Sequence, residues 1–415
     1  MAKTAENVNG LLKQVWEKAR LRALEEEADL ARMIAEEGKN HGVQPWDWRH
    51  FAEKLRARKF NFSEGELKPY LQLEKIIDAC FSVASRLFAI KAVQRTDIAG
   101  YHPDVRVFEI RDFNDNLIAL FLGDYFARPS KRSGAWMSSF QSQHKLPLKN
   151  GARGEMPIIY NVCNFAKPAD GSIGQIPIIY NVCNFAKPAA GKASLLSLDE
   201  ARTVFHEFGH ALHGMLSNVT YPSVSGTAVS RDFVELPSQL YEHWLTVPAI
   251  LKEFAVHYET GEPMPEVLLD KVLAARTFNS GFATVEFTSS ALVDMAFHTR
   301  EPTEPPMTVE REVLAEIGMP TSIVMRHRTP HFSHVFSGDG YSAGYYSYMW
   351  SEVLDADAFD AFMETGNAFN PETARKLKDN IYSAGGSVDP EDAYKAFRGK
   401  LPSPDAMLRK KGLAA

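Results

Sequence analysis

Two histidines and a glutamate in the middle of the chain have a spacing that suits a metal ion. His206, Glu207 and His210 fit the pattern H-E-x-x-H, and residues 198–216 around them carry apolar side chains at helical intervals. Histidines four residues apart project from one side of a helix, so both imidazoles can reach a single Zn2+. Glu207 lies about 100° round the helix axis, close enough to bond to a water on the metal. The spacing predicts a zinc site in which Glu207 activates water.

Because so short a pattern can arise by chance on a charged helix, the prediction needs a third ligand. A catalytic zinc takes three protein ligands and keeps one position open. Glu235, 25 residues after the second histidine, supplies a carboxylate at the head of another helical pattern. The longer pattern H-E-x-x-H-x-x-G-x-x-H fails, since residue 213 is His and residue 216 is Leu. We therefore interpret His213 as structural, and Ser238 and Gln239 as either supports for Glu235 or ordinary polar helix residues.

Several regular elements are needed to position these residues. Helical patterns cover residues 5–40, 46–60 and 67–94, and they dominate again after residue 197. Residues 103–125 are rich in β-branched and aromatic side chains around an Asn-Asp-Asn turn, which predicts a hairpin. We expect a mostly α-helical fold with a small β-sheet beside the active-site helix.

The same patterns divide the chain into three parts. We expect a helical subdomain at residues 1–100 that forms part of a channel wall. A β-containing segment follows at 101–196, and a helical catalytic region with the zinc site and a substrate loop at 197–415. In the second part, PIIYNVCNFAKPA occurs at residues 157–169 and again at 177–189. Two copies are too few for a solenoid, so we expect one copy to occupy a strand of the sheet.

Composition narrows the classes of partner. The 415 residues carry a formal net charge of -6, which gives no overall basic field for nucleic acid or an anionic membrane. Three cysteines are too few for a disulfide framework, and no apolar run approaches the length of a membrane span. The N-terminus also lacks a secretory pattern. We expect a cytoplasmic monomer that contacts neither nucleic acid nor a membrane.

The sequence around the motif resembles a known family. Residues 205–244 read FHEFGHALHGMLSNVTYPSVSGTAVSRDFVELPSQLYEHW, and further similar segments are LGDYFARPSKRSGAWM, PIIYNVCNFAKP and HFSHVFSGDGYSAGYYSYMWSEVLDADAF. Over residues 104–400 the chain resembles the thimet oligopeptidase family of zinc metallopeptidases, within it the bacterial peptidyl-dipeptidase (dipeptidyl carboxypeptidase) branch. We expect it to differ from the family by a short N-terminal part and by the 20-residue duplication.

The resemblance implies a site and an activity. It implies one Zn2+ per chain on His206, His210 and Glu235, with Glu207 as the general base. It further implies that a glycine-rich loop faces the scissile peptide bond, with Tyr341 and His334 in catalysis and Tyr348 and Tyr345 in substrate binding. The expected reaction is hydrolysis of short peptides with release of C-terminal dipeptides. Endo-acting cleavage, or an inactive remnant that binds zinc or peptides, are the alternatives.

Two further features have competing interpretations. Release of C-terminal dipeptides needs a cation for the substrate carboxylate, and Arg231, Arg326 and Arg328 are available, although each also fits an ordinary surface or structural charge. Residues 340–344 match G-x-S-x-G, the nucleophile pattern of serine hydrolases. No histidine follows Ser342, and the segment before it does not read as a buried strand, so the context argues against a serine hydrolase.

Overall fold

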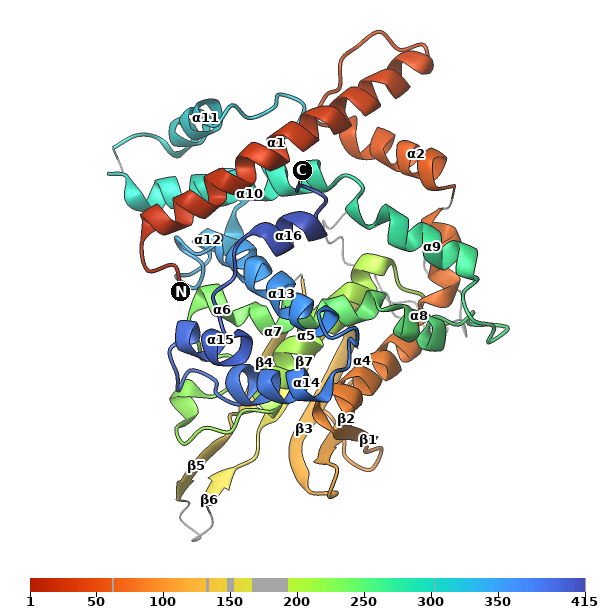
Figure 1. The fold of residues 1–415 in the computed structure, drawn as a ribbon, viewed down its shortest axis with the longest axis vertical. Helices are drawn as coiled ribbons and strands as arrows, with labels where there is room; N and C mark the ends of the chain where they lie inside the picture. Colours follow the sequence, from red (N-terminus) through yellow and green to blue (C-terminus); the bar gives the residue numbers. More distant parts are fainter. Residues whose placement is uncertain (62, 132–133, 148–152, 166–192, 302, 415) are drawn as a thin grey trace.

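The computed structural model describes residues 1–61, 63–131, 134–147, 153–165, 193–301 and 303–414. Helices dominate this part of the chain (Figure 1). In order they are α1 (Ala5–Glu36), α2 (Trp48–Phe60), α3 (Glu64–Leu67), α4 (Leu73–Phe88), α5 (Leu198–Met215), α6 (Arg231–Val234), α7 (Leu236–Glu242), α8 (Pro248–Phe254), α9 (Glu266–Ala274), α10 (Ser280–Thr299), α11 (Pro306–Glu316), α12 (Ser333–Phe336), α13 (Ser347–Met363), α14 (Pro371–Leu377), α15 (Pro390–Arg398) and α16 (Asp405–Lys410). The mostly α-helical fold predicted from the sequence is confirmed.

Five strands form a small sheet in the order β1-β2-β3-β7-β4, and two more form a separate ribbon. Their bounds are β1 (Ile90–Gln94), β2 (Arg106–Asp112), β3 (Leu117–Phe126), β4 (Trp136–Gln141), β5 (His144–Pro147), β6 (Arg153–Glu155) and β7 (Ile158–Phe165). Antiparallel pairing of β2 with β3 confirms the hairpin predicted at residues 103–125. The β7 strand runs parallel to β3 and antiparallel to β4.

The helix predicted over residues 67–94 was too long. Ala89 adopts a left-handed conformation with a φ of 55°, which ends α4 at Phe88. The next five residues form β1, whose register pairs Ile90 with Asp112. Apolar side chains at helical intervals continue into this strand, so periodicity alone did not reveal the boundary.

The first copy of the repeat supplies β7, which places it inside the sheet between β3 and β4. Residues 166–169 of that copy and the whole second copy at 177–189 lie outside the described residues. The first copy therefore occupies a strand of the sheet, and the expectation that only one of the two copies does so stays a prediction.

Two large hydrophobic clusters dominate the interior of the described residues, beside a small third cluster around Val107 and Leu122. In the sheet core, the inner face of the sheet packs against α4, α5, α7, α8 and α14, with buried side chains such as Phe121, Phe205 and Trp244. In the helical core, α1, α2, α10, α12 and α16 pack together around residues such as Trp48, Phe282 and Met407. Figure 1 shows α1 and α10 lying side by side, on the far side of α5 and α7 from the strands.

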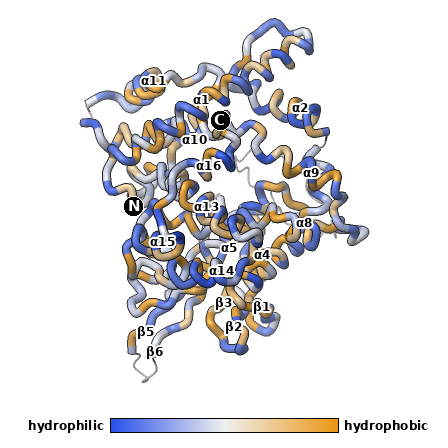
Figure 2. The backbone as a smooth tube through the Cα atoms, in the orientation of Figure 1, coloured by the Kyte–Doolittle hydropathy of each residue, from blue (hydrophilic) through white to orange (hydrophobic). Residues whose placement is uncertain are grey.

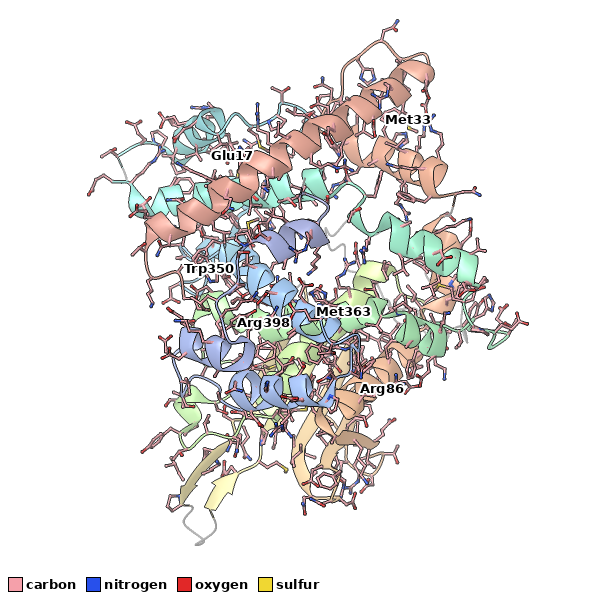
Figure 3. The ribbon with its side chains drawn as sticks, in the orientation of Figure 1. Glu17, Met33, Arg86, Trp350, Met363 and Arg398 are labelled. Atoms are coloured by element: carbon pink, nitrogen blue, oxygen red, sulfur yellow. The ribbon has the colours of Figure 1, made fainter. Side chains whose placement is uncertain are left out.

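Helix α13 belongs to both cores. Its Leu354, Ala358 and Phe362 are buried in the sheet core, whereas Met349 and Val353 are buried in the helical core. Partly buried Trp350, labelled in Figure 3, packs against both clusters. This one helix therefore links the two halves of the molecule.

Polar and apolar residues are mixed along the helices, as the blue and orange segments of the tube in Figure 2 show. Within the described ranges, no helix combines the length and the apolar character needed to cross a membrane.

Candidate metal centre and catalytic site

The helix that carries both histidines, α5, begins at a complete capping box. The Ser197 side chain accepts the backbone N–H of Glu200, and the Glu200 carboxylate accepts the backbone N–H of Ser197. These bonds satisfy donors that a helix start leaves free. Its apolar face is buried in the sheet core, while His206 and His210 project from the other side with 21% and 12% of their side chains exposed. The fixed helix sets the distance between the two imidazoles.

Glu235 comes from a second segment that crosses α5 at very close range. It lies between α6 and α7, where Pro237 occupies the first turn of α7. A Cβ atom on Gly209 would lie 2.6 Å from the Pro237 carbonyl oxygen and 2.7 Å from the Ser238 Cα. Only glycine permits this approach. Gly209 is one of the variable positions in H-E-x-x-H, so the motif itself did not mark it as important.

The three predicted ligands converge. The Oε2 atom of Glu235 lies 3.3 Å from His206 Nε2 and 3.0 Å from His210 Nε2. One ligand atom from each residue lies within 4.8 Å of the others, and these three residues could hold a metal ion. Burial acts to raise the pKa of Glu235, but the two histidines more than offset it, and the net pKa is well below the usual range. The carboxylate is therefore the anionic form that a metal requires.

Two neighbours orient these ligands. The Ser238 hydroxyl donates to Glu235 Oε2 at 3.0 Å, as the sequence suggested for that position. His206 Nδ1–H donates to Glu242 Oε1 at 2.6 Å, which leaves Nε2 facing Glu235. Sequence reasoning missed Glu242, although it lies seven residues after Glu235 and hence two helical turns along the same face. Carboxylates that hold the far nitrogen of a ligating histidine commonly fix its tautomer.

Glu207 lies between these histidines with its carboxylate buried. It is 5% exposed, and its Oε2 atom has no hydrogen-bond partner among the described residues. Burial raises the pKa of Glu207 above its ordinary value, although the histidines on either side of it act in the opposite direction. An unsatisfied buried carboxylate oxygen is costly, which makes Glu207 a candidate functional residue.

The glycine-rich loop brings Tyr341 to the same place. Its hydroxyl donates to Glu235 Oε1 at 3.0 Å, so the two oxygens of that carboxylate face different partners. Tyr348 donates to the Tyr341 oxygen at 3.1 Å, and His334 Nε2 lies 2.9 Å from the Tyr348 hydroxyl. Burial and the charge of Glu235 raise the pKa of Tyr341 to about 12, while burial lowers the pKa of His334. At neutral pH the phenol remains protonated and can donate.

Tyr345 and His213 lie deeper in the protein. The Tyr345 ring is 4% exposed and stacks on Phe287 with ring centroids 4.8 Å apart. Its ring is 5.5 Å from that of His334, so any part in substrate binding stays a prediction. His213 is fully buried, and neither ring nitrogen has a hydrogen-bond partner within the described ranges. Gln239 likewise has a buried Oε1 atom without such a partner.

The three candidate arginines differ in their partners. Arg328 forms an ion pair at 2.5 Å with the buried carboxylate of Glu310. The guanidinium of Arg231 lies over the Tyr341 ring, 4.5 Å from its centroid. Arg326 is tied through its backbone N–H to the Glu286 carbonyl oxygen. The Arg328 side chain is therefore engaged within the protein, and a role of Arg231 or Arg326 toward a substrate carboxylate stays a prediction.

The rival nucleophile is not set up for catalysis. The Ser342 hydroxyl donates to the backbone carbonyl oxygens of Val335 and Gly338, at 3.1 and 3.4 Å. A serine nucleophile instead needs its hydroxyl bonded to a base. This geometry removes the serine-hydrolase interpretation of residues 340–344.

Comparisons with known proteins identify the family of this chain. The model of peptidase family M3 matches residues 1–413, and the chain therefore belongs to this family. The resemblance to the thimet oligopeptidase family is confirmed at that level. The chain is 40% identical to the dipeptidyl carboxypeptidase of Escherichia coli K12, over all of this chain and 57% of that protein. It is also 40% identical to oligopeptidase A of the same strain, over 99% of this chain and 58% of that protein.

The chain thus spans less than three fifths of the length of these curated relatives. Among solved structures, the M32 carboxypeptidase from Deinococcus radiodurans R1 aligns with 99% of this chain and 67% of that protein, at 13% identity and a TM-score of 0.44.

Proposed function

We propose that this chain hydrolyses peptide bonds in short peptides, using one zinc ion held by His206, His210 and Glu235. The observation that carries the proposal is the convergence of these three ligand atoms within 4.8 Å, together with the buried carboxylate of Glu207, whose Oε2 atom has no hydrogen-bond partner in the part of the chain that the structure describes. Two imidazoles and one carboxylate are a donor set of catalytic zinc sites, and they leave a fourth position open. Bound zinc would supply a Lewis acid that makes water more acidic and the peptide carbonyl more polarised.

Glu207 is the proton carrier in this proposal. Its free Oε2 atom can accept a proton from the attacking water and then give it to the amine that leaves. Its burial keeps bulk water away from that carboxylate, which preserves the proton for the leaving group.

Tyr341 and His334 stabilise negative charge on the carbonyl oxygen. Tyr341 is a donor on a loop next to the ligands, where it can turn from Glu235 to an oxygen that becomes charged only in the transition state. Tyr348 donates to the Tyr341 oxygen, which polarises the Tyr341 hydroxyl and makes it a better donor. His334 holds Tyr348 in turn, and Tyr345 packs beside that imidazole.

Short peptides are the proposed substrates, and removal of C-terminal dipeptides is the proposed mode. Similarity to a dipeptidyl carboxypeptidase favours this mode, whereas equal identity to an oligopeptidase A keeps endo-acting cleavage as the alternative. Arg231 is the proposed partner of the substrate carboxylate, because it lies against Tyr341 and no ion pair engages it within the described part of the chain.

An internally quenched peptide, with and without o-phenanthroline, tests the reaction. We expect cleavage that the chelator abolishes and added zinc restores. Protein that carries stoichiometric zinc yet cleaves nothing would instead be the inactive, peptide-binding remnant. A matched pair of peptides, one with a free and one with an amidated C-terminus, tests the mode by mass spectrometry. Only cleavage that depends on the free carboxylate supports dipeptide release, and Arg231→Gln should then raise KM for that peptide alone.

We also propose that the protein acts as a monomer in the cytoplasm. Cys80 and Cys163 are buried free thiols, which agrees with a reducing compartment. Light scattering at working concentration would test the oligomeric state.

A further inference from the structure

The loop at residues 337–346 has little to hold it in shape by itself. It joins α12 to α13, contains Gly338, Gly340 and Gly344, and has Ala343 at a φ of 53°. Within the loop, the Gly344 N–H donates to the Tyr341 carbonyl oxygen at 2.8 Å. Glycine-rich segments have many accessible conformations, and ordering them costs entropy. The place of the Tyr341 hydroxyl therefore depends on contacts from outside the loop.

Two such contacts to the loop backbone come from one carboxylate on α10. Asp294 is fully buried, and its Oδ1 atom accepts the Ala343 N–H at 3.0 Å while its Oδ2 atom accepts the Tyr345 N–H at 2.9 Å. The two donors lie on either side of Gly344, so a single side chain fixes both flanks of the most adaptable residue. His298, one turn further along α10, approaches the same Oδ1 atom with its Nδ1 at 2.9 Å.

Helix α10 is itself held firmly against α1. At its start, the Gly281 and Phe282 N–H groups donate to the buried carboxylate of Glu26, at 3.1 and 2.8 Å. A Cβ atom on Gly281 would lie 2.5 Å from the backbone nitrogen of Ala23, so the two helices touch at their backbones. Asp294 therefore projects from an element whose position the helical core fixes.

We propose that Asp294 is a positioning residue that holds Tyr341 over the metal centre through the backbone of Ala343 and Tyr345. The expected effect of Asp294 on catalysis rests on the proposed function. The anchoring of the loop by Asp294 does not depend on that function. A buried carboxylate bonded to two backbone N–H groups could also serve stability alone, and the test must separate these two roles.

Asp294→Asn is the main variant, since an amide keeps the size but has one accepting oxygen in place of two. We expect kcat to fall about 10- to 100-fold, with an unchanged zinc content. Glu26→Gln is the matched control, because Glu26 bonds two backbone N–H groups of the same helix far from the loop. It should lower the melting temperature to a similar extent and change kcat by less than about threefold.

A double-mutant cycle decides whether Asp294 acts through Tyr341. Adding Asp294→Asn to Tyr341→Phe should cost no further activity, since the phenol that Asp294 positions is already gone. Losses that simply multiply would overturn the proposal. Adding Glu26→Gln to Tyr341→Phe gives the independent behaviour for comparison.

Cleavage of the loop by chymotrypsin provides a readout that needs no peptidase activity. Asp294→Asn should speed cutting after Tyr341 or Tyr345 at least about tenfold relative to Glu26→Gln, because a released loop is a better protease substrate. Equal cutting rates would refute the anchor. Should Asp294→Asn fail to fold, His298→Ala, which removes a 27% exposed side chain, should accelerate cutting about threefold. A wild-type chain without peptidase activity would remove the proposed function, while these cutting rates would still decide the anchor.

Discussion

The proposed ligand residues and the tyrosine loop are held in place by different means, although they meet at the Glu235 carboxylate. His206 and His210 sit on α5 and Glu235 directly precedes α7, and these two elements of the sheet core touch at their backbones through Gly209. Tyr341 instead sits on a glycine-rich loop that is tied by hydrogen bonds to α10 of the helical core. Packed helices fix a metal site to tenths of an ångström, whereas a tied loop can shift to admit and release a peptide.

We call His206, His210, Glu235 and their helices the ligand half of the site, and residues 337–346 the loop half. Substitutions in these two halves should impair activity in different ways. A change among the ligand helices should alter metal binding or proton transfer, whereas a change in the loop should alter the transition state and leave the metal in place. Helix α13 is the link, because it is buried in both cores and begins directly after the loop.

Glu207→Gln should cause the largest loss of activity of any variant in the ligand half. The amide cannot take up a proton, so we expect kcat to fall at least about a thousandfold. Zinc content, measured by atomic absorption, should not change, because Glu207 is not among the three clustered ligands. Retained turnover would remove Glu207 from the role of base.

Tyr341→Phe, in the loop half, should lower kcat by a smaller factor. Loss of one donor to a developing oxyanion typically costs about a hundredfold in kcat. Because the interaction forms in the transition state, KM for a quenched peptide should change little. Tyr345→Phe is the matched control, since that ring is buried against Phe287, and it should change kcat far less. A comparable loss in both variants would contradict a specific role for the Tyr341 hydroxyl.

Glu242→Gln should weaken zinc binding by the ligand half. Its carboxylate holds His206 Nδ1 at 2.6 Å, and loss of such a partner typically lowers metal affinity about 10- to 100-fold. Competition with a fluorescent chelator would measure the zinc Kd. Asp199→Asn neutralises an 89% exposed carboxylate on α5, the helix that carries His206, and should leave that Kd unchanged. An equal effect of both variants would mean that net charge, rather than orientation, governs affinity.

The sequence predicted the ligand half more fully than the loop half, for physical reasons. Helical periodicity makes residues four apart share a face, so His206 and His210 could be read directly, and Glu242 could have been found by the same rule from Glu235. The fold class and the β2–β3 hairpin followed from periodicity in the same way. The end of α4 was missed because a left-handed Ala89 gives no signal in the pattern.

Contacts between distant segments were beyond such reasoning. Asp294 meets Ala343 and Tyr345 across 49 and 51 residues, and no local spacing encodes that distance. The close crossing at Gly209 was hidden for the same reason, because its partner Pro237 lies in a later element. Without structure, the resemblance to a family suggested which loop residues matter, but not what holds them.

The smallest expected effect is a pH dependence of the free energy of unfolding, and it comes from His213 on α5. His213 is fully buried among the residues of α5, and burial lowers its pKa to about 3 from an ordinary value of 6.5. Because the unfolded chain takes up the proton first, His213 favours unfolding as pH falls below about 6.5, by about 1.4 kcal/mol per pH unit until the folded pKa is reached. At pH 7.5 both states are neutral at this residue, and the effect is absent.

Urea unfolding at pH 7.5 and pH 5.0, in the presence of a chelator, would measure this contribution. His213→Phe removes the titrating group, so wild type should lose about 2 kcal/mol more stability than the variant between the two pH values. Working without metal keeps protonation of His206 and His210 the same in both proteins, so that the difference reports on His213 alone. A parallel pH dependence in the two proteins would mean that His213 is protonated in the folded state, and that its ring nitrogens find partners, such as water, in solution. In that case water would reach His213, and α5 would be packed less tightly than the structure indicates. The contrast between a rigid ligand half and an adaptable loop half would then be smaller.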